Sequence, residues 1–300
     1  MSAPTTVASS PSQAASPWYR YWQSQDHQAR FDGRSRLDIR NLARMVESFN
    51  ETMLLRRCLQ PPRPLHLLEV GCATGEMFRY LRARAPWARY EGIDVSAPAI
   101  ARAQQKYPAI RCGQVEPGVP FSESLAALRF SPHPDVVFAR DVLQHQVKPR
   151  SLLAELIKTA AEAVILRCRT RDAGATEWDP ERSCQYHYGG WMPYIVININ
   201  ELMEAIRAHA PEAEVVIMRH HMILGGRHNR FVPKSLYDAE AGGAETAVGI
   251  FQAAATPGRI RIEDHADRTS TLTWDYRLRS AAAQLWQAAF SRNRRGEFHA

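Results

Sequence analysis

Two acidic residues and two glycines lie at a spacing that could hold a nucleoside. Glu69 lies near the end of the mainly apolar run 65–70, and glycines follow at positions 71 and 75. Glycine lets the backbone turn sharply and approach a ligand, because it has no Cβ atom. A second apolar run ends at Asp94, 23 residues after Gly71, where a carboxylate can accept hydrogen bonds from both ribose hydroxyls. Because ligands of open α/β sheets bind beyond the carboxyl ends of the strands, this spacing predicts an adenosine there.

A nicotinamide dinucleotide is the alternative ligand for the same architecture. Its fingerprint needs Gly-x-Gly-x-x-Gly, because the pyrophosphate must approach both the loop and the helix start. Here position 73 is alanine, and the glycines are spaced Gly-x-x-x-Gly. The spacing therefore disfavours NAD and favours an adenosine ligand without a pyrophosphate.

Two histidines are candidates for a general base. Histidine titrates near neutral pH and can accept a proton from a hydroxyl group. His145 follows the apolar run 135–139 by a few residues, so it is expected at the ligand-binding edge; the alternative is that it caps or packs the next helix. His187 lies in a long segment rich in aromatic residues, 169–199, and could be the base instead.

Three aromatic residues of that segment are candidates for substrate binding: Tyr188, Trp191 and Tyr194. Together with the Gly189-Gly190 pair they suit a lid or a substrate wall, because the segment follows a strand at the open edge of the sheet. The alternative is an aromatic cluster that only anchors a long loop. Aspartates and histidines also occur here, but no ligand spacing supports a metal site, and none is assigned.

The elements that must position these residues alternate between strands and helices. This alternation predicts a doubly wound, mostly parallel sheet of seven strands with helices on both faces. Within it, a helix is expected over 201–209, with Asn200 as its cap. The expected strands are 65–70, 90–94, 109–112, 135–139, 163–168, 214–218 and 248–253.

The chain is expected to carry extensions around this core. Residues 1–17 contain no basic residue and no apolar core, so they predict a disordered tail rather than a signal peptide. The other expected parts are a helical extension or cap at 18–60, the main domain at 61–256 with substrate-side insertions at 169–199 and 223–245, and a C-terminal extension at 257–300.

Composition narrows the class of partner and compartment. Five widely spaced cysteines argue against a disulfide framework and fit a reducing cytoplasm. No apolar run is long enough for a membrane span. The formal net charge of +7 is most simply a solvated surface, with attraction of an anionic substrate as the sharper alternative. Nucleic acid has no motif in its favour.

Three segments together resemble class I S-adenosylmethionine-dependent methyltransferases. The segment 69–75, Glu-Val-Gly-Cys-Ala-Thr-Gly, is similar to their first motif, and 91–96 resembles the second. The segment 135–145 is similar to their fourth strand and the turn after it. The resemblance covers roughly residues 65–168 and, more loosely, the strands up to position 253. It implies a Rossmann-like methyltransferase fold with S-adenosyl-L-methionine as cofactor.

The resemblance also implies a set of cofactor contacts. The loop containing Gly71, Cys72 and Gly75 would cradle the methionine portion, with Glu69 near its amino group. Asp94, followed by Val95, would bind the ribose. At the adenine, where the family often has an aspartate, the contacts would be Gln114 and Val115, with Glu116 as a near alternative. Arg140 would lie beside the methionine end, and a salt bridge from Arg140 to Asp141 is the alternative for that residue.

These features favour an enzyme that methylates an oxygen atom of a small biosynthetic acceptor. A glycan, a lipid-linked sugar and a secondary metabolite all remain open, and the acceptor could be anionic. One alternative is an RNA methyltransferase, favoured by the net charge; another is a non-catalytic cofactor-binding subunit, since fold does not fix function. The extensions outside the core are expected to cover the acceptor site or to build a homodimer.

Overall fold

The computed structural model describes residues 49–187, 190–221, 229–230, 243–253 and 256–264, together with Trp18 and Trp22. The chain divides into two compact units, Met1–Glu263 and Asp264–Ala300. The predicted tail at 1–17 and most of the predicted helical extension at 18–60 lie outside the described residues.

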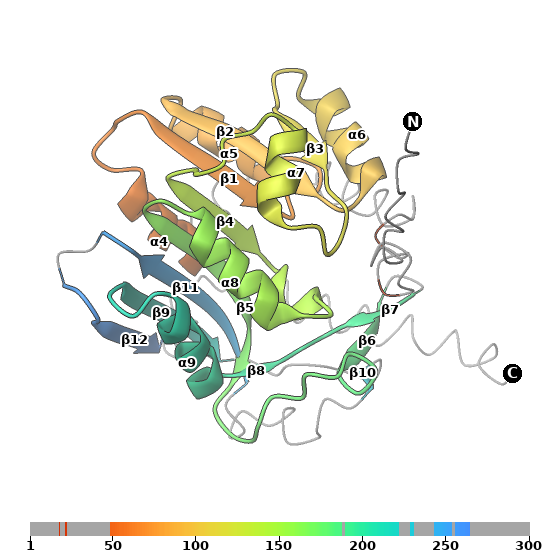
Figure 1. The fold of residues 1–300 in the computed structure, drawn as a ribbon, viewed down its shortest axis with the longest axis vertical. Helices are drawn as coiled ribbons and strands as arrows, with labels where there is room; N and C mark the ends of the chain where they lie inside the picture. Colours follow the sequence, from red (N-terminus) through yellow and green to blue (C-terminus); the bar gives the residue numbers. More distant parts are fainter. Residues whose placement is uncertain are drawn as a thin grey trace, which may run out of the picture. The chain divides into compact units, whose positions relative to one another are not determined.

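One large sheet forms the centre of the described residues, with strand order β12-β9-β11-β5-β4-β1-β2-β3 and the short β8 beside β5 (Figure 1). The pairs joining β3, β2, β1, β4 and β5 are parallel, whereas β11 runs antiparallel to both β5 and β9. The predicted doubly wound, mostly parallel arrangement is confirmed, and β8 and β12 are added to the seven expected strands. The strands are β1 (Leu65–Val70), β2 (Ala88–Asp94), β3 (Cys112–Gln114), β4 (Val136–Arg140), β5 (Ala163–Arg171), β8 (Ile197–Asn198), β9 (Glu214–His221), β11 (Ala244–Phe251) and β12 (Ile260–Asp264).

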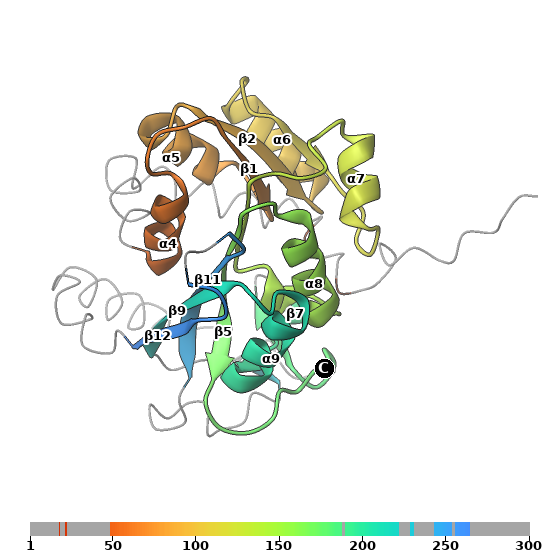
Figure 2. The same cartoon turned by 60° about the vertical axis from the view of Figure 1, so that its left-hand side comes forward.

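Helices cover both faces of this sheet, as Figure 2 shows. Leucine and isoleucine side chains of α7, α8 and α9 pack on one face, and apolar side chains of α4, α5 and α6 pack on the other. The central strands are therefore buried on both sides, which explains their nearly continuous apolar sequences. The helices are α4 (Asn50–Cys58), α5 (Glu76–Arg84), α6 (Ala97–Lys106), α7 (Phe121–Ala127), the 3₁₀ turn η3 (Leu143–His145), α8 (Pro149–Thr159) and α9 (Ile199–His209).

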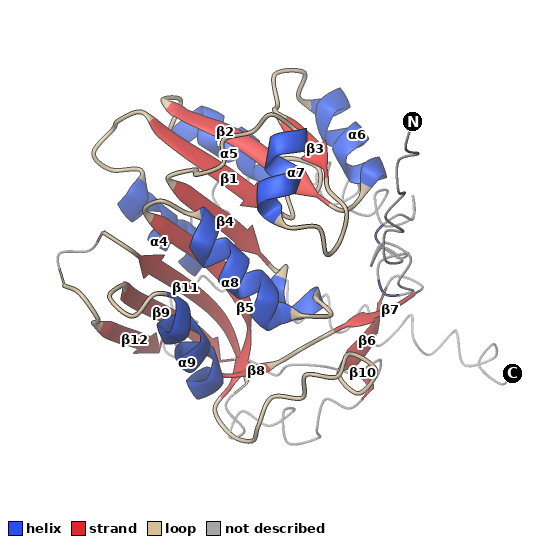
Figure 3. Cartoon of the chain, in the orientation of Figure 1, coloured by secondary structure: helices blue, strands red, loops and turns tan. Residues whose placement is uncertain are grey.

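The aromatic-rich segment 169–199 contains a β-hairpin where only a long insertion was expected. Strands β6 (Cys184–His187) and β7 (Gly190–Pro193) pair antiparallel, and β10 (Asn229–Arg230) adds a third strand (Figure 3). Just after β7, the backbone N–H of Ile195 donates to the carbonyl of Gln144 in η3, at 2.8 Å. The hairpin is thereby attached to the turn that follows β4.

Helix α9 begins two residues earlier than predicted, and its cap is Asn198 rather than Asn200. The Asn198 side chain accepts hydrogen bonds from the backbone N–H groups of Asn200 and Glu201, at 2.9 and 3.4 Å. It also donates to the carbonyls of Asp172 and Gly174, so long-range partners fix which asparagine acts as the cap. None of the described helices has the length and apolar character needed to cross a membrane.

Candidate functional site

The loop between β1 and α5 takes the tight course that its glycines predicted. Gly71 and Gly75 have φ of +76° and +82°, a region that favours glycine. A Cβ atom at Gly71 would lie 2.4 Å from Cγ2 of Val142, so this position also needs glycine for space. The N–H groups of Gly71 and Cys72 both donate to the carbonyl of Ile93, at 2.8 and 3.1 Å. These bonds hold the loop against the end of β2.

Asp94, at the end of β2, lies directly against this loop. One carboxylate oxygen accepts from the N–H of Ala73 at 2.9 Å, and the other accepts from the N–H of Ser96 at 2.8 Å. Burial raises the pKa of Asp94, and the backbone hydrogen bonds oppose that rise. Since a carboxylate has about four lone-pair positions, two anchored oxygens still have capacity for the hydroxyls of a ribose.

Glu69 is buried beside the same loop. Its carboxyl group accepts a hydrogen bond from the hydroxyl of Tyr90 at 2.6 Å. Burial raises the pKa of Glu69 to about 8, although Tyr90 and the charge of Arg140 both oppose the rise. A ligand ammonium group next to Glu69 would favour its ionised form, because opposite charges stabilise one another at low dielectric.

The other predicted cofactor residues gather at the ends of β2 and β3. Gln114 is exposed and its amide donates to the carbonyl of Val95 at 3.4 Å, while the N–H of Val115 donates to the carbonyl of Asp94 at 3.0 Å. The sulfur of Cys72, by contrast, is buried in the core under the loop. Burial raises the pKa of this thiol well above its usual value, so Cys72 can contribute its backbone to a ligand but is not suited to be a nucleophile.

Arg140 is the last residue of β4, which lies beside β1 and so ends close to the glycine loop. Among the described residues, Asp141 forms salt bridges with Arg167 and Arg169 and none with Arg140, so the alternative prediction for Arg140 is wrong. Burial opposes ionisation of Asp141, but these arginines hold its pKa well below its usual range. The guanidinium of Arg140 lies over the ring of Phe49, 5.8 Å from its centroid.

His145 lies at the carboxyl edge of the sheet, as predicted, and its ring is oriented by the hairpin. Its Nδ1 atom lies 2.8 Å from the carbonyl oxygen of Pro193. A carbonyl oxygen can only accept, so Nδ1 carries the proton in the neutral ring and Nε2 keeps its lone pair. Burial lowers the pKa of His145, and the hydrogen bond to Pro193 opposes this effect. In this tautomer Nε2 is the ring nitrogen that is able to accept a proton.

Two aromatic rings flank His145. The ring centroids of Tyr194 and Trp22 lie 6.1 and 5.5 Å from that of His145. Tyr194 is buried and its N–H donates to the carbonyl of Ser183 at 2.9 Å. Burial raises the pKa of its hydroxyl, and the positive charge of Arg169 opposes that rise. The predicted residue Tyr194 is therefore next to His145.

The other predicted acceptor residues lie elsewhere or outside the described part. Trp191 packs edge-on against Tyr186 across the hairpin, with ring centroids 5.4 Å apart. This contact supports the anchoring alternative for Trp191. The side chains of His187 and Tyr188 are not among the described residues, so the structure leaves His187 untested as the base.

Sequence reasoning missed several residues of this edge: Trp22, Phe49, Arg169 and Pro193. Only Arg169 could have been found from the local sequence. Arg167 and Arg169 follow the apolar part of β5, and alternate residues of a strand lie on the same face, so the two arginines are expected side by side at the end of that strand. The others contact the site from distant segments. Within the described ranges, no three His, Cys, Asp or Glu side chains gather closely enough to hold a metal ion.

Residues 42–206 match a family model described as a methyltransferase domain. The trans-aconitate 2-methyltransferase of Methylobacterium nodulans is 30% identical over 109 residues, which are 36% of this chain and 39% of the relative. The enzyme of the same name from Acidovorax sp. is 29% identical over 112 residues, 37% of this chain and 40% of the relative. The matched region thus spans well under half of each relative.

Two solved structures are similar at lower identity. The N-terminal domain of EvdMO1 with S-adenosylhomocysteine bound is 16% identical with a TM-score of 0.46, over 68% of this chain and 81% of that chain. Magnesium protoporphyrin IX methyltransferase from Synechocystis, with S-adenosylmethionine bound, is 17% identical with a TM-score of 0.44, over 82% and 100% of the two chains.

Proposed function

The chain belongs to the family of methyltransferase domains, and from this premise we propose that it methylates an oxygen atom of a small biosynthetic acceptor. Its first two motifs are those of the class I enzymes, which take the methyl group from S-adenosylmethionine. The acceptor and the identity of the accepting atom are the proposed part.

The cofactor site is supported by residues that are already held in place. Asp94 is fixed by two backbone N–H groups and would bind the ribose. Glu69 would receive the amino group of the methionine portion, and Arg140 its carboxylate. Gln114 is exposed at the end of β3, where its amide can bind an adenine edge. Bound there, the cofactor supplies an activated methyl group on sulfur.

The observation that favours a hydroxyl as the accepting group is the orientation of His145. With Nδ1 bonded to Pro193, Nε2 would take the proton of an acceptor hydroxyl as its oxygen bonds to the methyl carbon. S-adenosylmethionine, held by Glu69, Asp94 and Gln114, would supply that methyl group and would keep the electron pair of its carbon–sulfur bond. Rings of Trp22 and Tyr194 beside His145 would limit water at the reacting oxygen.

A carboxylate acceptor is the second candidate, and the names of the curated relatives favour it. Trans-aconitate is a small carboxylic acid, and the net charge of +7 would attract an anion. A carboxylate is already ionised at neutral pH and needs no base. The two candidates therefore differ in whether turnover depends on His145.

The test is methyl transfer by the purified chain, using S-adenosylmethionine with a labelled methyl group. A panel of phenols, sugars and carboxylic acids including trans-aconitate is offered, and products are identified by mass spectrometry. We expect an O-methyl product, with His145→Gln about a hundredfold slower on a hydroxyl acceptor and the exposed His209→Gln unchanged. Transfer to nitrogen or carbon alone, or unchanged turnover of His145→Gln on a hydroxyl, would contradict the proposal.

A further inference from the structure

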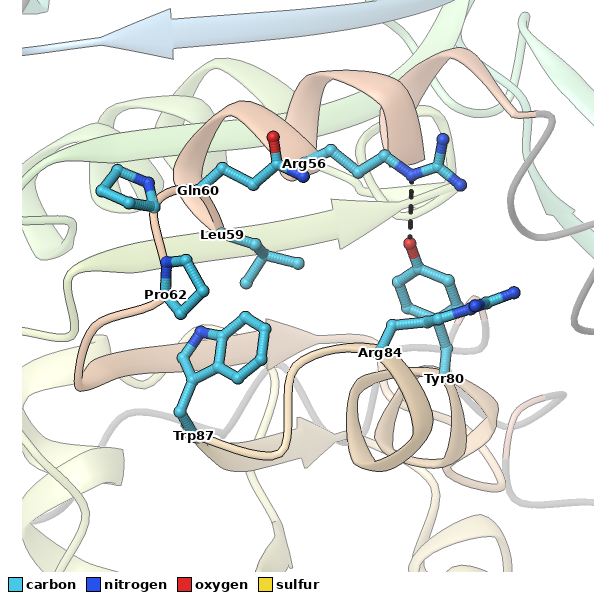
Figure 4. A pocket seen from close by; sticks show the side chains of 8 residues that line it. Arg56, Leu59, Gln60, Pro62, Tyr80, Arg84 and Trp87 are labelled. Atoms are coloured by element: carbon cyan, nitrogen blue, oxygen red, sulfur yellow. Dashed lines mark hydrogen bonds between the residues drawn. The ribbon is translucent and has the colours of Figure 1, made fainter.

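Figure 4 shows a cavity of 690 Å³. It lies near the amino ends of β1 and β2, whereas the residues described above lie at the carboxyl ends of the strands. The segment Leu59–Pro62 leads into the amino end of β1, and Trp87 immediately precedes β2. The glycine loop and Asp94 lie at the carboxyl ends of the same two strands. The cavity is therefore distinct from the cofactor site. Its lining residues are Arg56, Leu59, Gln60, Pro61, Pro62, Tyr80, Arg84 and Trp87.

The two sides of the cavity differ in chemistry. Figure 4 shows Trp87 on one side and Tyr80 on the other, with the guanidinium groups of Arg56 and Arg84 on the Tyr80 side. Nε of Arg56 donates to the hydroxyl of Tyr80 at 3.4 Å. Trp87 is 37% exposed, so part of its side chain is accessible to a ligand from solvent. One side thus offers positive charge and the other a planar aromatic face.

Among the described residues that line the cavity none is acidic, so the two arginines give this part of the lining a charge of +2. A guanidinium group binds carboxylate or phosphate oxygens well, because its planar donors match their geometry. Both arginines already interact with other parts of the protein, so an anion would add to their hydrogen bonds. Apolar walls from Leu59 and two prolines suit the remainder of an organic molecule. The volume lies in the usual range for small-ligand pockets, about 300–1,000 Å³.

We propose that this cavity binds a planar aromatic anion, a ring that carries a phosphate or a carboxylate, as a ligand separate from both cofactor and acceptor. The ring stacks on Trp87, and the anionic group lies between Arg56 and Arg84. Because the lining comes from α4, the segment Leu59–Pro62, α5 and the residue before β2, one ligand would bridge these parts of the chain.

The proposal is tested by calorimetry on the full chain in saturating S-adenosylhomocysteine, which keeps adenosine-containing probes out of the cofactor site. The probes are AMP for the phosphate source and 2-naphthoate for the carboxylate source, with inorganic phosphate and adenosine as the separated halves. We expect AMP or 2-naphthoate, or both, to bind about tenfold more tightly than inorganic phosphate or adenosine. Which of the two binds identifies the source of the anion.

Two variants locate the binding. Arg84→Gln and Trp87→Ala should each weaken the probe about tenfold, with S-adenosylhomocysteine affinity unchanged. Arg82→Gln, which removes the same charge from an exposed position of α5 outside the cavity, should leave binding intact. Failure of both complete probes, or equal weakening by Arg82→Gln, overturns the proposal. Because affinity for S-adenosylhomocysteine is measured separately, this result is independent of the proposed function.

Discussion

The Nδ1 atom of His145 and the carbonyl oxygen of Pro193 lie 2.8 Å apart, although 48 residues separate them in the chain. His145 belongs to the turn after β4, and Pro193 ends the hairpin strand β7. The hairpin therefore decides which nitrogen of the ring carries the proton. Together with the hydrogen bond from Ile195 to Gln144, this contact connects the aromatic-rich insertion to the carboxyl edge of the sheet.

The first prediction concerns pH. With a hydroxyl acceptor, only neutral His145 has a lone pair on Nε2, so kcat/KM should fall as pH drops through its pKa. Burial lowers that pKa below the usual value of 6.5, so activity should persist to lower pH than for an unperturbed histidine. The measurement is the profile of kcat/KM for the acceptor over about pH 5 to 8, with S-adenosylmethionine kept saturating. A flat profile with a hydroxyl acceptor would exclude His145 as the base, whereas a flat profile is expected with a carboxylate acceptor.

Tyr194 is predicted to act as a positioning residue. Its ring lies next to that of His145, and its hydroxyl interacts with the positive charge of Arg169 just after Pro193, which orients His145. Tyr194→Phe keeps the ring but loses the hydroxyl and its interaction with Arg169, and should lower kcat several-fold, up to about tenfold, with cofactor affinity unchanged. Nitrogen NMR of His145 should show a less populated Nδ1–H tautomer. Tyr186→Phe, in the same hairpin, is the matched control, and an equal effect there would argue for mere structural damage.

Glu69 is predicted to make the free protein less stable as pH rises. Its pKa is about 8 in the folded protein against an ordinary value of 4.5, so the folded state binds more protons between these limits. The unfolding free energy contributed by this group should therefore fall by up to about 1.4 kcal/mol per pH unit across that window. Glu69→Gln removes the titration and should flatten the profile in urea unfolding. Parallel profiles for Glu69→Gln and the unchanged protein would show that this carboxyl is ionised in the fold.

Gly71 is predicted to be irreplaceable for two separable reasons. Gly71→Ala adds a Cβ atom 2.4 Å from Cγ2 of Val142 and places alanine at φ +76°, a backbone cost of about 1–2 kcal/mol. In Val142→Ala the nearest remaining atom is Cβ, at 3.8 Å, so the clash disappears while the backbone strain remains. The double variant should thus recover part of the stability lost by Gly71→Ala. The measurement is urea unfolding of all four proteins, and no recovery would mean that the clash is relieved in another way.

Sequence reasoning succeeded where the informative residues are neighbours along the chain. The apolar strand, the glycine turn and the second acidic strand end are contiguous over 65–94, and the structure follows them closely. The hairpin was missed although Gly189-Gly190 lies between two runs of strand-forming residues, which is a recognised turn signal. Contacts between distant segments could not be foreseen. The partner of His145 and the choice of Asn198 over Asn200 both depend on such contacts.

The most direct test of the proposed cofactor site is calorimetric titration of the purified chain with S-adenosylmethionine and S-adenosylhomocysteine, with NAD as comparison. We predict dissociation constants on the order of micromolar for the first two and no comparable affinity for NAD. Asp94→Ala should weaken both by about tenfold or more, because it removes the proposed ribose contact, while the exposed Glu123→Gln binds normally. If the folded chain binds neither compound, or if Asp94→Ala binds them as well as the unchanged protein, the cofactor site described here is wrong.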